Sequence, residues 1–241
     1  MIIETHSEIG LSSENQDEFI VIRNKESLCM AICDGHGKYG KLAAERVKKG
    51  IKSGGAILGE NDKYNDFFVE RMAKYLKKLG GSFCDSGVSL CCFYKIKNSF
   101  YLIQIGDCSA FLKTESSFLF FPGHRVDNPQ NAQDLRRSFA CGGILKIFNN
   151  SAYLSDKKQK TFLRVTKCFG NSSLKKIIDR NPDVHFIKEN IHSVVIGSSG
   201  FDAEVGEIAA LTKDKCDLNK FVQNQKIRGI KENFTICIAY F

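Results

Sequence analysis

A pair of apolar runs joined by a short polar turn constrains the fold of this chain more than any other feature. Residues 88–96 and 100–105 flank the turn 97–99, and two apolar runs around so short a turn are typical of a β-hairpin. The stretch 109–121 repeats the pattern around its own polar turn. Because a hairpin pairs its strands antiparallel, these segments favour antiparallel sheets over a parallel sheet with alternating strands and helices.

The other periodic segments indicate further strands and two clear helices. Apolar or β-branched runs predict strands at residues 19–23, 28–33, 184–187, 193–197 and 234–240. Apolar side chains share one helical face within residues 42–51 and 68–79, and weaker patterns predict helices at residues 132–140, 201–211 and 218–224. Hairpins with helices inserted in pairs predict the α+β class, with a central antiparallel β-sandwich flanked by helix pairs.

The length of the chain suits one large domain. It has 241 residues, with no internal repeat and no linker long enough to separate two domains. We therefore expect a single domain over residues 1–241. The stretch 149–160 is polar and basic, and we interpret it as a mobile flap or loop.

Composition argues against several classes of partner. No apolar run approaches the ~20 residues of a membrane-spanning helix, and the first residues lack the basic and apolar segments of a secretion signal. The net charge is +8, but the lysines are spread out and no aromatic–basic motif accompanies them, so a nucleic-acid partner rests on charge alone. We expect the protein to bind neither a membrane nor a nucleic acid. We expect a monomeric chain with acidic protein partners, such as phosphoproteins.

Ten cysteines are present, but their positions do not indicate a disulfide framework. Several lie inside apolar runs, where a free cysteine acts as a small hydrophobic residue; these are Cys33, Cys91, Cys92, Cys108 and Cys237. No Cys-x-x-Cys pair is present, which argues against a structural zinc site. We expect an intracellular protein, cytoplasmic or nuclear, because these compartments keep thiols reduced.

Residues 31–37 carry the most specific chemistry of the chain. An apolar run ends in Asp34, Gly35, His36 and Gly37. This order predicts a carboxylate at the end of a buried strand, in a turn without bulky side chains. A hard divalent cation favours such a carboxylate together with a backbone carbonyl and room for water. Taken alone, an Asp-Gly pair is also typical of an ordinary turn.

Other polar or acidic turns adjoin predicted strands in the same way. They are the segments 15–17, 106–107, 198–200 and 232–233. Because they recur at strand ends, we expect them to gather at one mouth of the sheet sandwich.

The order and spacing of these segments resemble the metal-dependent protein phosphatase 2C family, of the PPM type, over nearly the whole chain. Asp34-Gly35-His36-Gly37 matches the family's signature. Residues 105–110, Ile-Gly-Asp-Cys-Ser-Ala, resemble its Val-Gly-Asp-Ser-Arg-Ala, and residues 163–170, Leu-Arg-Val-Thr-Lys-Cys-Phe-Gly, resemble its Leu-Ala-Val-Ser-Arg-Ala-Leu-Gly. Further matches lie at residues 10–17, 86–89, 124–129, 142–143, 182–184 and 232–235.

The resemblance implies hydrolysis of phosphoserine or phosphothreonine with two Mg²⁺ or Mn²⁺ ions, which activate water and neutralise the phosphate. By the same resemblance, Asp34 would bridge both ions and the Gly35 carbonyl would bind one. Asp17 would hold a water of the metal shell, and Asp107 would support the site or hold a weak third ion. His36 would donate a proton to the leaving oxygen.

Each of these side chains also has a structural interpretation. Asp17 and Asp107 could be ordinary turn residues. His36 could be a histidine satisfied within its turn, and Glu232 could be a salt-bridged surface acid.

The sequence departs from the family pattern at three places. Ser199 stands where the family has a metal-ligand aspartate, so the site loses one negative charge. Glu232 replaces the final ligand aspartate, and its extra methylene moves the carboxylate by roughly 1.5 Å. Ser12 and Ser13 stand where an arginine would bind two phosphate oxygens, which a hydroxyl group cannot do.

These departures leave two interpretations open. The first is a phosphatase with impaired activity, at least one weakened metal site and a phosphoprotein substrate. The second is an inactive pseudophosphatase that keeps the sandwich and binds a regulatory protein as a scaffold. Asp17, Asp34 and His36 favour the enzyme, whereas Ser199 and the absent arginine favour the scaffold.

Overall fold

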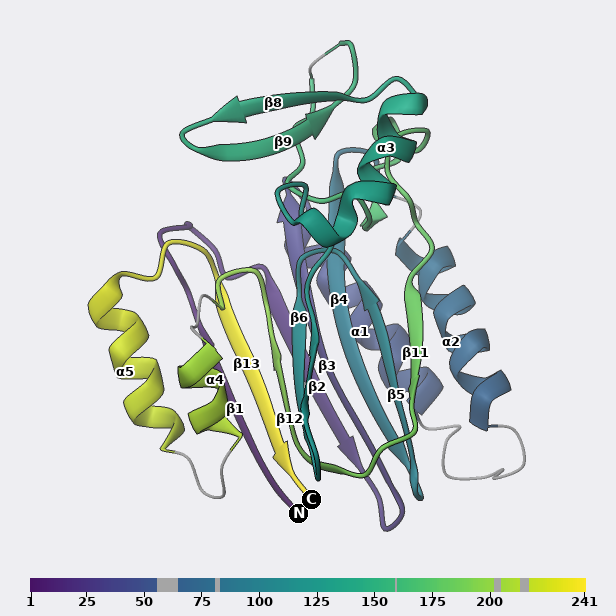
Figure 1. Ribbon diagram of the computed structural model, residues 1–241. Coiled ribbons are helices and arrows are strands. Elements are labelled where there is room, and N and C mark those ends of the chain that lie inside the picture. The colour runs from purple at the N-terminus through teal and green to yellow at the C-terminus, as the bar shows by residue number, and fades with distance from the viewer. Residues whose placement is uncertain (56–64, 81–82, 159, 202–204, 213–216) are drawn as a thin grey trace.

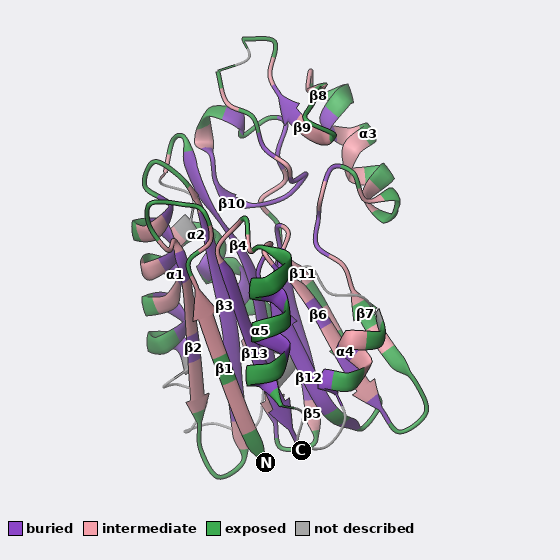
Figure 2. Ribbon diagram, turned by 90° about the vertical axis from the view of Figure 1, so that its left-hand side faces the viewer, coloured by how far each residue is buried: buried purple, intermediate pink, exposed green. Residues whose placement is uncertain are grey.

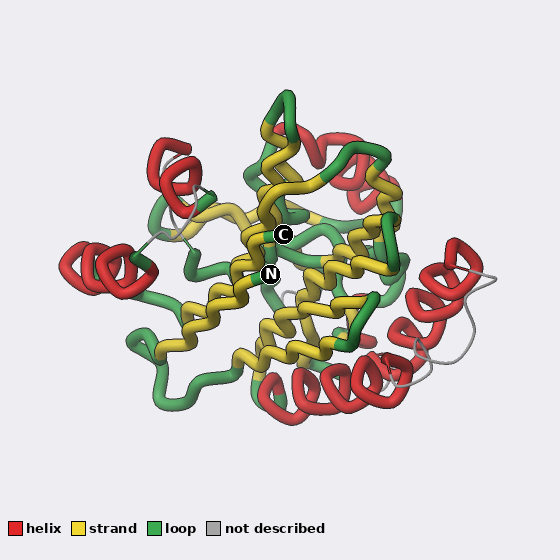
Figure 3. The backbone as a smooth tube through the Cα atoms, turned by 90° about the horizontal axis from the view of Figure 1, so that it is seen from below, coloured by secondary structure: helices red, strands yellow, loops and turns green. Residues whose placement is uncertain are grey.

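The apolar runs on either side of residues 97–99 form a hairpin within one of the two large antiparallel sheets, as the computed structural model shows (Figure 1). The structure describes residues 1–241 except residues 56–64, 81–82, 159, 202–204 and 213–216. Viewed from one end, the two sheets form adjacent rows of strands with helices on the outside (Figure 3). The predicted α+β class and antiparallel β-sandwich are confirmed.

The first sheet has the strand order β11-β5-β4-β3-β2, with β10 paired to β4. Its strands are β2 (Asp17–Arg23), β3 (Ser27–Gly37), β4 (Ser86–Ile96), β5 (Ser99–Ile105), β10 (Phe169–Gly170) and β11 (Asp183–Ile187). The second sheet has the order β1-β13-β12-β6-β7. Its strands are β1 (Ile2–Glu8), β6 (Ser109–Thr114), β7 (Phe118–Phe121), β12 (Ile191–Gly197) and β13 (Phe234–Tyr240).

A pair of helices packs on the outer face of each sheet. The first sheet is covered by α1 (Gly40–Gly55) and α2 (Asn65–Gly80), and the second by α4 (Val205–Leu211) and α5 (Leu218–Arg228). The predicted helix at 201–211 therefore begins later, at Val205, and residues 202–204 lie outside the described part. Helix α5 runs four residues beyond the predicted end at residue 224. No helix in the described ranges is both long and apolar enough to cross a bilayer.

Strand β3 shows why the sequence has a continuous apolar run there. Leu28, Met30 and Ile32 pack between the two sheets, whereas the alternate residues Cys29 and Ala31 face the helices α1 and α2. Because both faces of the strand are covered, alternation between apolar and polar residues is lost. The buried central strands stand out in Figure 2. The nine described cysteines are free thiols, seven of them buried.

The structure corrects the expectation of a turn at residues 34–37. These residues continue strand β3 and pair with β4, so that Asp34 lies opposite Ser89 and Gly37 opposite Ser86. A glycine is required at residue 35, because a Cβ atom there would collide with the backbone carbonyl of Gly40.

A small subdomain stands over one end of the sandwich and contains α3 (Ala132–Ala140), β8 (Ile144–Phe148) and β9 (Ser151–Ser155). We call the pair β8 and β9 the flap hairpin. The stretch 149–160, expected to be a flap or loop, thus supplies a full strand. Asn149 and Asn150 both have positive φ angles, 47° and 61°, as a two-residue hairpin turn of type I′ requires. The short helices η2 (Pro129–Asn131) and η3 (Ser172–Leu174) complete this region.

Candidate functional site

Strands β2 and β3 place two carboxylates side by side at one end of the sandwich. Asp17 lies directly opposite Asp34 in their antiparallel register. Asp34 continues the series of Leu28, Met30 and Ile32, which face the second sheet, so the two-residue period of a strand directs it into the space between the sheets. Both acids are buried, with 4% of Asp17 and 8% of Asp34 exposed. Strand pairing therefore fixes this pair of acids.

Burial makes the ionised forms of these acids costly. It raises the pKa of Asp17 to about 6. Burial, together with the negative charges of Asp17 and Asp107, raises the pKa of Asp34 well above its usual range. Both side-chain oxygens of Asp17 are buried without a partner in hydrogen-bond geometry among the described residues, and the nearby hydroxyls of Thr235 and Ser198 only partly oppose the rise in its pKa. A nearby cation would compensate the negative charge of these buried carboxylates.

The third carboxylate, Asp107, follows strand β5 in a tight turn. Ser89 Oγ donates a hydrogen bond of 2.6 Å to Asp107 Oδ1 and accepts one of 3.2 Å from the Asp107 amide. Gly106 has a φ angle of 84°, and a side chain there would collide with Ser89. We call Asp17, Asp34 and Asp107 the floor of the site.

A buried histidine supports this turn from behind. The His124 amide donates to the Gly106 carbonyl at 2.6 Å, and His124 Nε2 lies 2.7 Å from Asp183 Oδ2. Lys167 Nζ donates to Asp183 at 2.7 Å, and these contacts with His124 and Lys167 hold the pKa of Asp183 far below its usual range despite its partial burial. The segments 124–129, 163–170 and 182–184 thus meet in one network that positions the Asp107 turn.

His36 is held by an asparagine that the sequence did not single out. Asn171 Nδ2 lies 2.6 Å from His36 Nε2 and 3.3 Å from Cys168 Sγ. Asn171 is fully buried and has a φ angle of 46°, a conformation that asparagine adopts more readily than most residues. A Cβ atom at Gly87 would collide with both Asn171 and His36, so glycine is required there. Burial lowers the pKa of His36, and the Asp107 charge opposes this effect.

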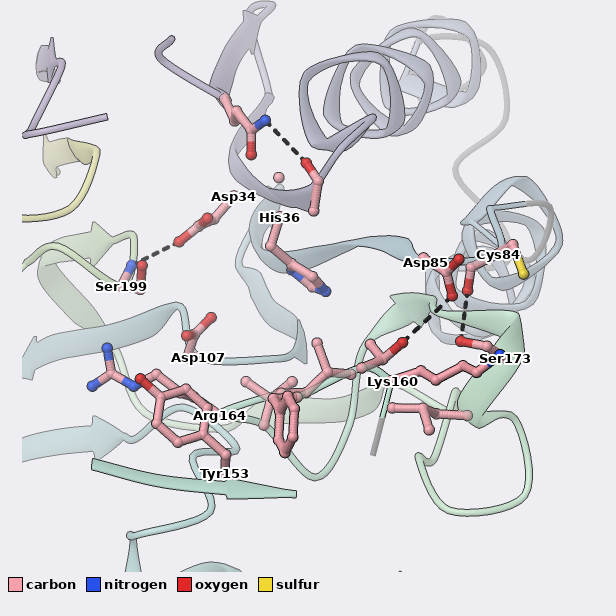
Figure 4. A pocket seen from close by; sticks show the side chains of 18 of the residues that line it. Asp34, His36, Cys84, Asp85, Asp107, Tyr153, Lys160, Arg164, Ser173 and Ser199 are labelled. Atoms are coloured by element: carbon pink, nitrogen blue, oxygen red, sulfur yellow. Dashed lines mark hydrogen bonds between the residues drawn. The ribbon is translucent and has the colours of Figure 1, made fainter. Parts of the chain in front are cut away.

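These residues line one large pocket between the end of the sandwich and the flap hairpin. Its volume is about 840 Å³, and its wall includes Asp34, Gly35, His36, Asp107 and Glu232. Asp17 lies directly beside Asp34. In Figure 4, His36 lies between Asp34 and the side of the pocket that carries Cys84, Asp85 and Ser173. The structure therefore gathers every candidate residue from the sequence at one site.

The rim of the site, by which we mean Arg164, Ser199 and Glu232, differs from the floor. The Ser199 amide donates a hydrogen bond of 2.9 Å to Asp34 Oδ2, so Ser199 adjoins Asp34 as the resemblance implies. Glu232 accepts a hydrogen bond from Arg164 Nη1, and both side chains line the pocket. Ser12 also lines the pocket.

The floor suits a divalent cation that keeps several water ligands, rather than one that is ligated only by protein side chains. In the described part of the chain, no group of three or more histidine, cysteine, aspartate or glutamate side chains is arranged to hold a metal ion. Mg²⁺, however, usually keeps several waters and binds only one or two carboxylates. The unpaired oxygens of Asp17 and the carboxylates of Asp34 and Asp107 are hard oxygen ligands of that kind. The donor set therefore fits Mg²⁺ or Mn²⁺.

Sequence reasoning missed several residues of this site. Arg164 was seen only as part of a motif, although the alternation of Leu163, Arg164 and Val165 could have indicated a charged side chain opposite an apolar face. Tyr153 of the flap hairpin also lines the pocket. Nothing in the sequence pointed to Asn171 as the partner of His36, because that contact joins residues 135 positions apart.

Comparison with known proteins identifies the fold. No protein-family model and no curated protein matches the sequence. Among solved structures, the serine-threonine phosphatase 2C of Toxoplasma gondii is 15% identical, with a TM-score of 0.73 over 99% of this chain and 94% of that chain. The phosphatase Stp1 of Staphylococcus aureus is 16% identical, with a TM-score of 0.70 over 99% of this chain and 94% of that chain.

A third similar structure is the catalytic domain of the serine threonine protein phosphatase PstP, in complex with two manganese ions. It is 15% identical, with a TM-score of 0.66 over 99% of this chain and 97% of that chain. The chain therefore has the fold of the phosphatase 2C proteins, which confirms the fold expected from the resemblance.

Proposed function

We propose that this protein is a slow, divalent-cation-dependent phosphatase that hydrolyses phosphoserine or phosphothreonine in a protein substrate. The observation that carries this proposal is the floor of the pocket. Asp17 and Asp34 are register partners on adjacent strands, and both oxygens of Asp17 are buried without a partner in hydrogen-bond geometry in the described part of the chain. Burying carboxylates in this way destabilises a protein unless something compensates their charge.

The floor residues would hold Mg²⁺ or Mn²⁺. Asp34 and the Gly35 carbonyl would ligate directly, while Asp17 and Asp107 would ligate or bind water of the metal shell. When bound, two such ions would activate the attacking water and neutralise charge on the phosphoryl group. Glu232 would contribute a further carboxylate on release from Arg164.

His36 is the candidate proton donor to the leaving oxygen. It lines the pocket beside the floor, and Asn171 holds its ring from the buried side. A serine or threonine alkoxide is a poor leaving group, so protonation of its oxygen by a positioned side chain favours cleavage. Burial lowers the pKa of His36, and the Asp107 charge partly offsets this effect in favour of the protonated imidazole that this role needs.

The rim explains why we propose slow turnover. Ser199 offers a hydroxyl and an amide where an aspartate would add a negative charge, and Glu232 is engaged by Arg164. Removing one carboxylate from a dication site lowers affinity by ~100-fold or more. The Mn²⁺ or Mg²⁺ concentration needed for half-maximal activity should therefore be high. The free thiols of the described cysteines support a reducing compartment, the cytoplasm or the nucleus.

The test is hydrolysis of a phosphoserine peptide and an aryl phosphate over a wide range of Mn²⁺ concentration. We expect Mn²⁺-dependent hydrolysis that is lost in Asp34→Asn. Asp85→Asn is the matched control, because Asp85 lines the same pocket but is exposed. Hydrolysis that persists in Asp34→Asn would contradict the proposal. Absence of both hydrolysis and Mn²⁺ binding in the wild type would also contradict it, and would favour a scaffold.

A further inference from the structure

We propose that Arg164 binds the phosphate group of the substrate, in place of the arginine that the chain lacks at residues 12 and 13. The ligand class is a phosphate dianion, either a phosphomonoester or inorganic phosphate. This inference rests on the proposed function for the identity of the substrate. It assigns the phosphate contact to a different element, the strand-like segment that follows the flap hairpin.

The backbone around Arg164 is fixed on both sides. Leu163 exchanges two backbone hydrogen bonds with Leu154 of the flap hairpin, at 2.7 and 2.9 Å, and the Arg164 carbonyl accepts from the Val126 amide at 2.7 Å. Leu163 and Val165 are buried in the apolar cluster beneath the flap hairpin. Arg164 lies at a bend between them, is only partly buried, and lines the pocket. The segment thus presents a guanidinium group to the pocket from a rigid support.

The guanidinium group has capacity for a second partner. A guanidinium carries five N–H donors, and among the described residues only Glu232 accepts from it. The Arg164 side chain is 26% exposed and that of Glu232 is 42% exposed. An ion pair so open to water is weak, and a phosphate could replace Glu232 without leaving buried charges unpaired.

Glu232 also indicates what kind of ligand this arginine accepts. Its carboxylate is an oxyanion with two oxygens, and it approaches Arg164 within the pocket itself. A phosphate dianion carries more charge and a third oxygen, and guanidinium groups bind two phosphate oxygens at once through parallel N–H donors. Arg164 therefore already binds an oxyanion near the place where the substrate must lie.

The distribution of charge in the pocket points the same way. The carboxylates of the floor, Asp34 and Asp107, lie on the sandwich side, whereas residues 156–164 contribute one carboxylate, Asp156, and three cations to the pocket lining, Lys158, Lys160 and Arg164. A phosphate between the two sides would meet cations bound on the floor and the guanidinium on the other side. The two lysines are exposed and add attraction without fixing geometry.

The experiment measures the Kd of inorganic phosphate by ³¹P NMR in the presence of Mg²⁺. We expect Arg164→Gln to raise this Kd roughly tenfold or more, because charge-assisted hydrogen bonds are lost. Arg164→Lys should raise the Kd by a smaller factor, since a lysine keeps the positive charge but lacks the two parallel N–H donors of a guanidinium group. Lys157→Gln is the matched control, because Lys157 is exposed and lies outside the pocket lining; its Kd should equal that of the wild type.

A second arm uses a phosphoserine peptide and the same peptide without phosphate. A loss in Arg164→Gln that is confined to inorganic phosphate and the phosphopeptide supports the proposal. An equal loss for the unphosphorylated peptide would overturn it, because Arg164 would then bind the peptide chain. An unchanged phosphate Kd in Arg164→Gln, or no phosphate binding by the wild type, would also overturn it.

The binding assay separates this inference from the proposed function. If phosphate binding depends on Arg164 but no Mn²⁺-dependent hydrolysis is found, the proposed function fails and the phosphate site remains. If hydrolysis is found and Arg164→Gln leaves both KM and phosphate Kd unchanged, the phosphate site fails and the proposed function remains. Arg164→Lys, which keeps the alkyl chain, guards against a folding defect in Arg164→Gln.

Discussion

The floor and the rim of the pocket are built by different parts of the fold. The floor takes Asp17 and Asp34 from paired strands and Asp107 from a turn held by Ser89 and His124. The rim takes its residues from segments that lie outside the two sheets. Asp17 and Asp34 have their direction set by strand register, whereas rim residues have theirs set by local contacts, such as the pair of Arg164 and Glu232.

Two of the departures expected from the phosphatase 2C pattern, Ser199 and Glu232, lie on the rim. A change of Asp34 would alter a buried position in the ladder between β2, β3 and β4, but a change at Ser199 or Glu232 is accommodated by local hydrogen bonds. We infer that the floor carboxylates make cation binding possible, while the rim residues determine the affinity for cations and phosphate.

The largest effect should come from removing a floor carboxylate. Asp34→Asn should reduce Mn²⁺-dependent hydrolysis by on the order of 1000-fold, since a bound cation supplies several kcal/mol of transition-state stabilisation. Initial rates on an aryl phosphate would measure it. A similar loss in the control Asp85→Asn would break the distinction between the floor and the rest of the pocket.

The second prediction concerns stability without metal. Because the pKa of Asp17 is raised to about 6 in the folded protein, the folded state binds more protons than the unfolded state between pH ~4 and ~6, and the contribution of Asp17 to stability falls as the pH rises through this window. Asp17→Asn should therefore match the wild type near pH 4 and exceed it at pH 7 by up to about 3 kcal/mol.

Denaturant unfolding in the presence of a chelator would measure this difference. His36, whose pKa is lowered, acts in the opposite direction, so the comparison of Asp17→Asn with the wild type is needed to isolate Asp17. A difference that does not change with pH would mean that Asp17 is compensated by a group within the protein, and the argument for a cation would be lost.

The third prediction restores the rim. Ser199→Asp combined with Glu232→Asp should tighten Mn²⁺ binding by roughly 100-fold, because a new carboxylate would adjoin Asp34. Mn²⁺-dependent hydrolysis at low Mn²⁺ should rise accordingly. Ser173→Asp is the matched control, since it adds a charge to the same pocket on the side of Cys84 (Figure 4). An equal gain in that control would show that the effect is general electrostatics.

The smallest effect should come from Asn171→Ala, which removes the buried partner of His36. We expect a loss of about tenfold on a phosphoserine peptide, whose alkoxide needs protonation, and little loss on p-nitrophenyl phosphate, whose leaving group does not. The ratio of the two rates is the readout. Equal losses on both substrates would show that Asn171 only stabilises the fold.

The sequence predicted the sandwich because its central strands are long apolar runs with short turns. It also placed Asp17, Asp34 and Asp107 beside strands, but the opposition of Asp17 and Asp34 depends on the register of β2 and β3, which the turn at residues 24–26 sets. The turn expected at Asp34 was wrong, since pairing with β4 continues through two glycines. Strand β1 and the flap hairpin were missed because their polar residues obscure the alternation.

The rim could not be predicted in the same way. Ser199 and Glu232 were identified as departures, but the pairing of Glu232 with Arg164 joins residues 68 positions apart through loop backbone. The contact of Asn171 with His36 is equally remote in sequence. Side chains held by loops take their partners from tertiary packing, which a single sequence does not specify.

The central claim is that the floor binds a divalent cation, and electron paramagnetic resonance of free Mn²⁺ tests it most directly. We expect the wild type to bind Mn²⁺ with a Kd in the millimolar range, Asp34→Asn to lose this binding, and Asp85→Asn to retain it. Equal Mn²⁺ binding by the wild type and Asp34→Asn, or no detectable binding by the wild type, would contradict the account.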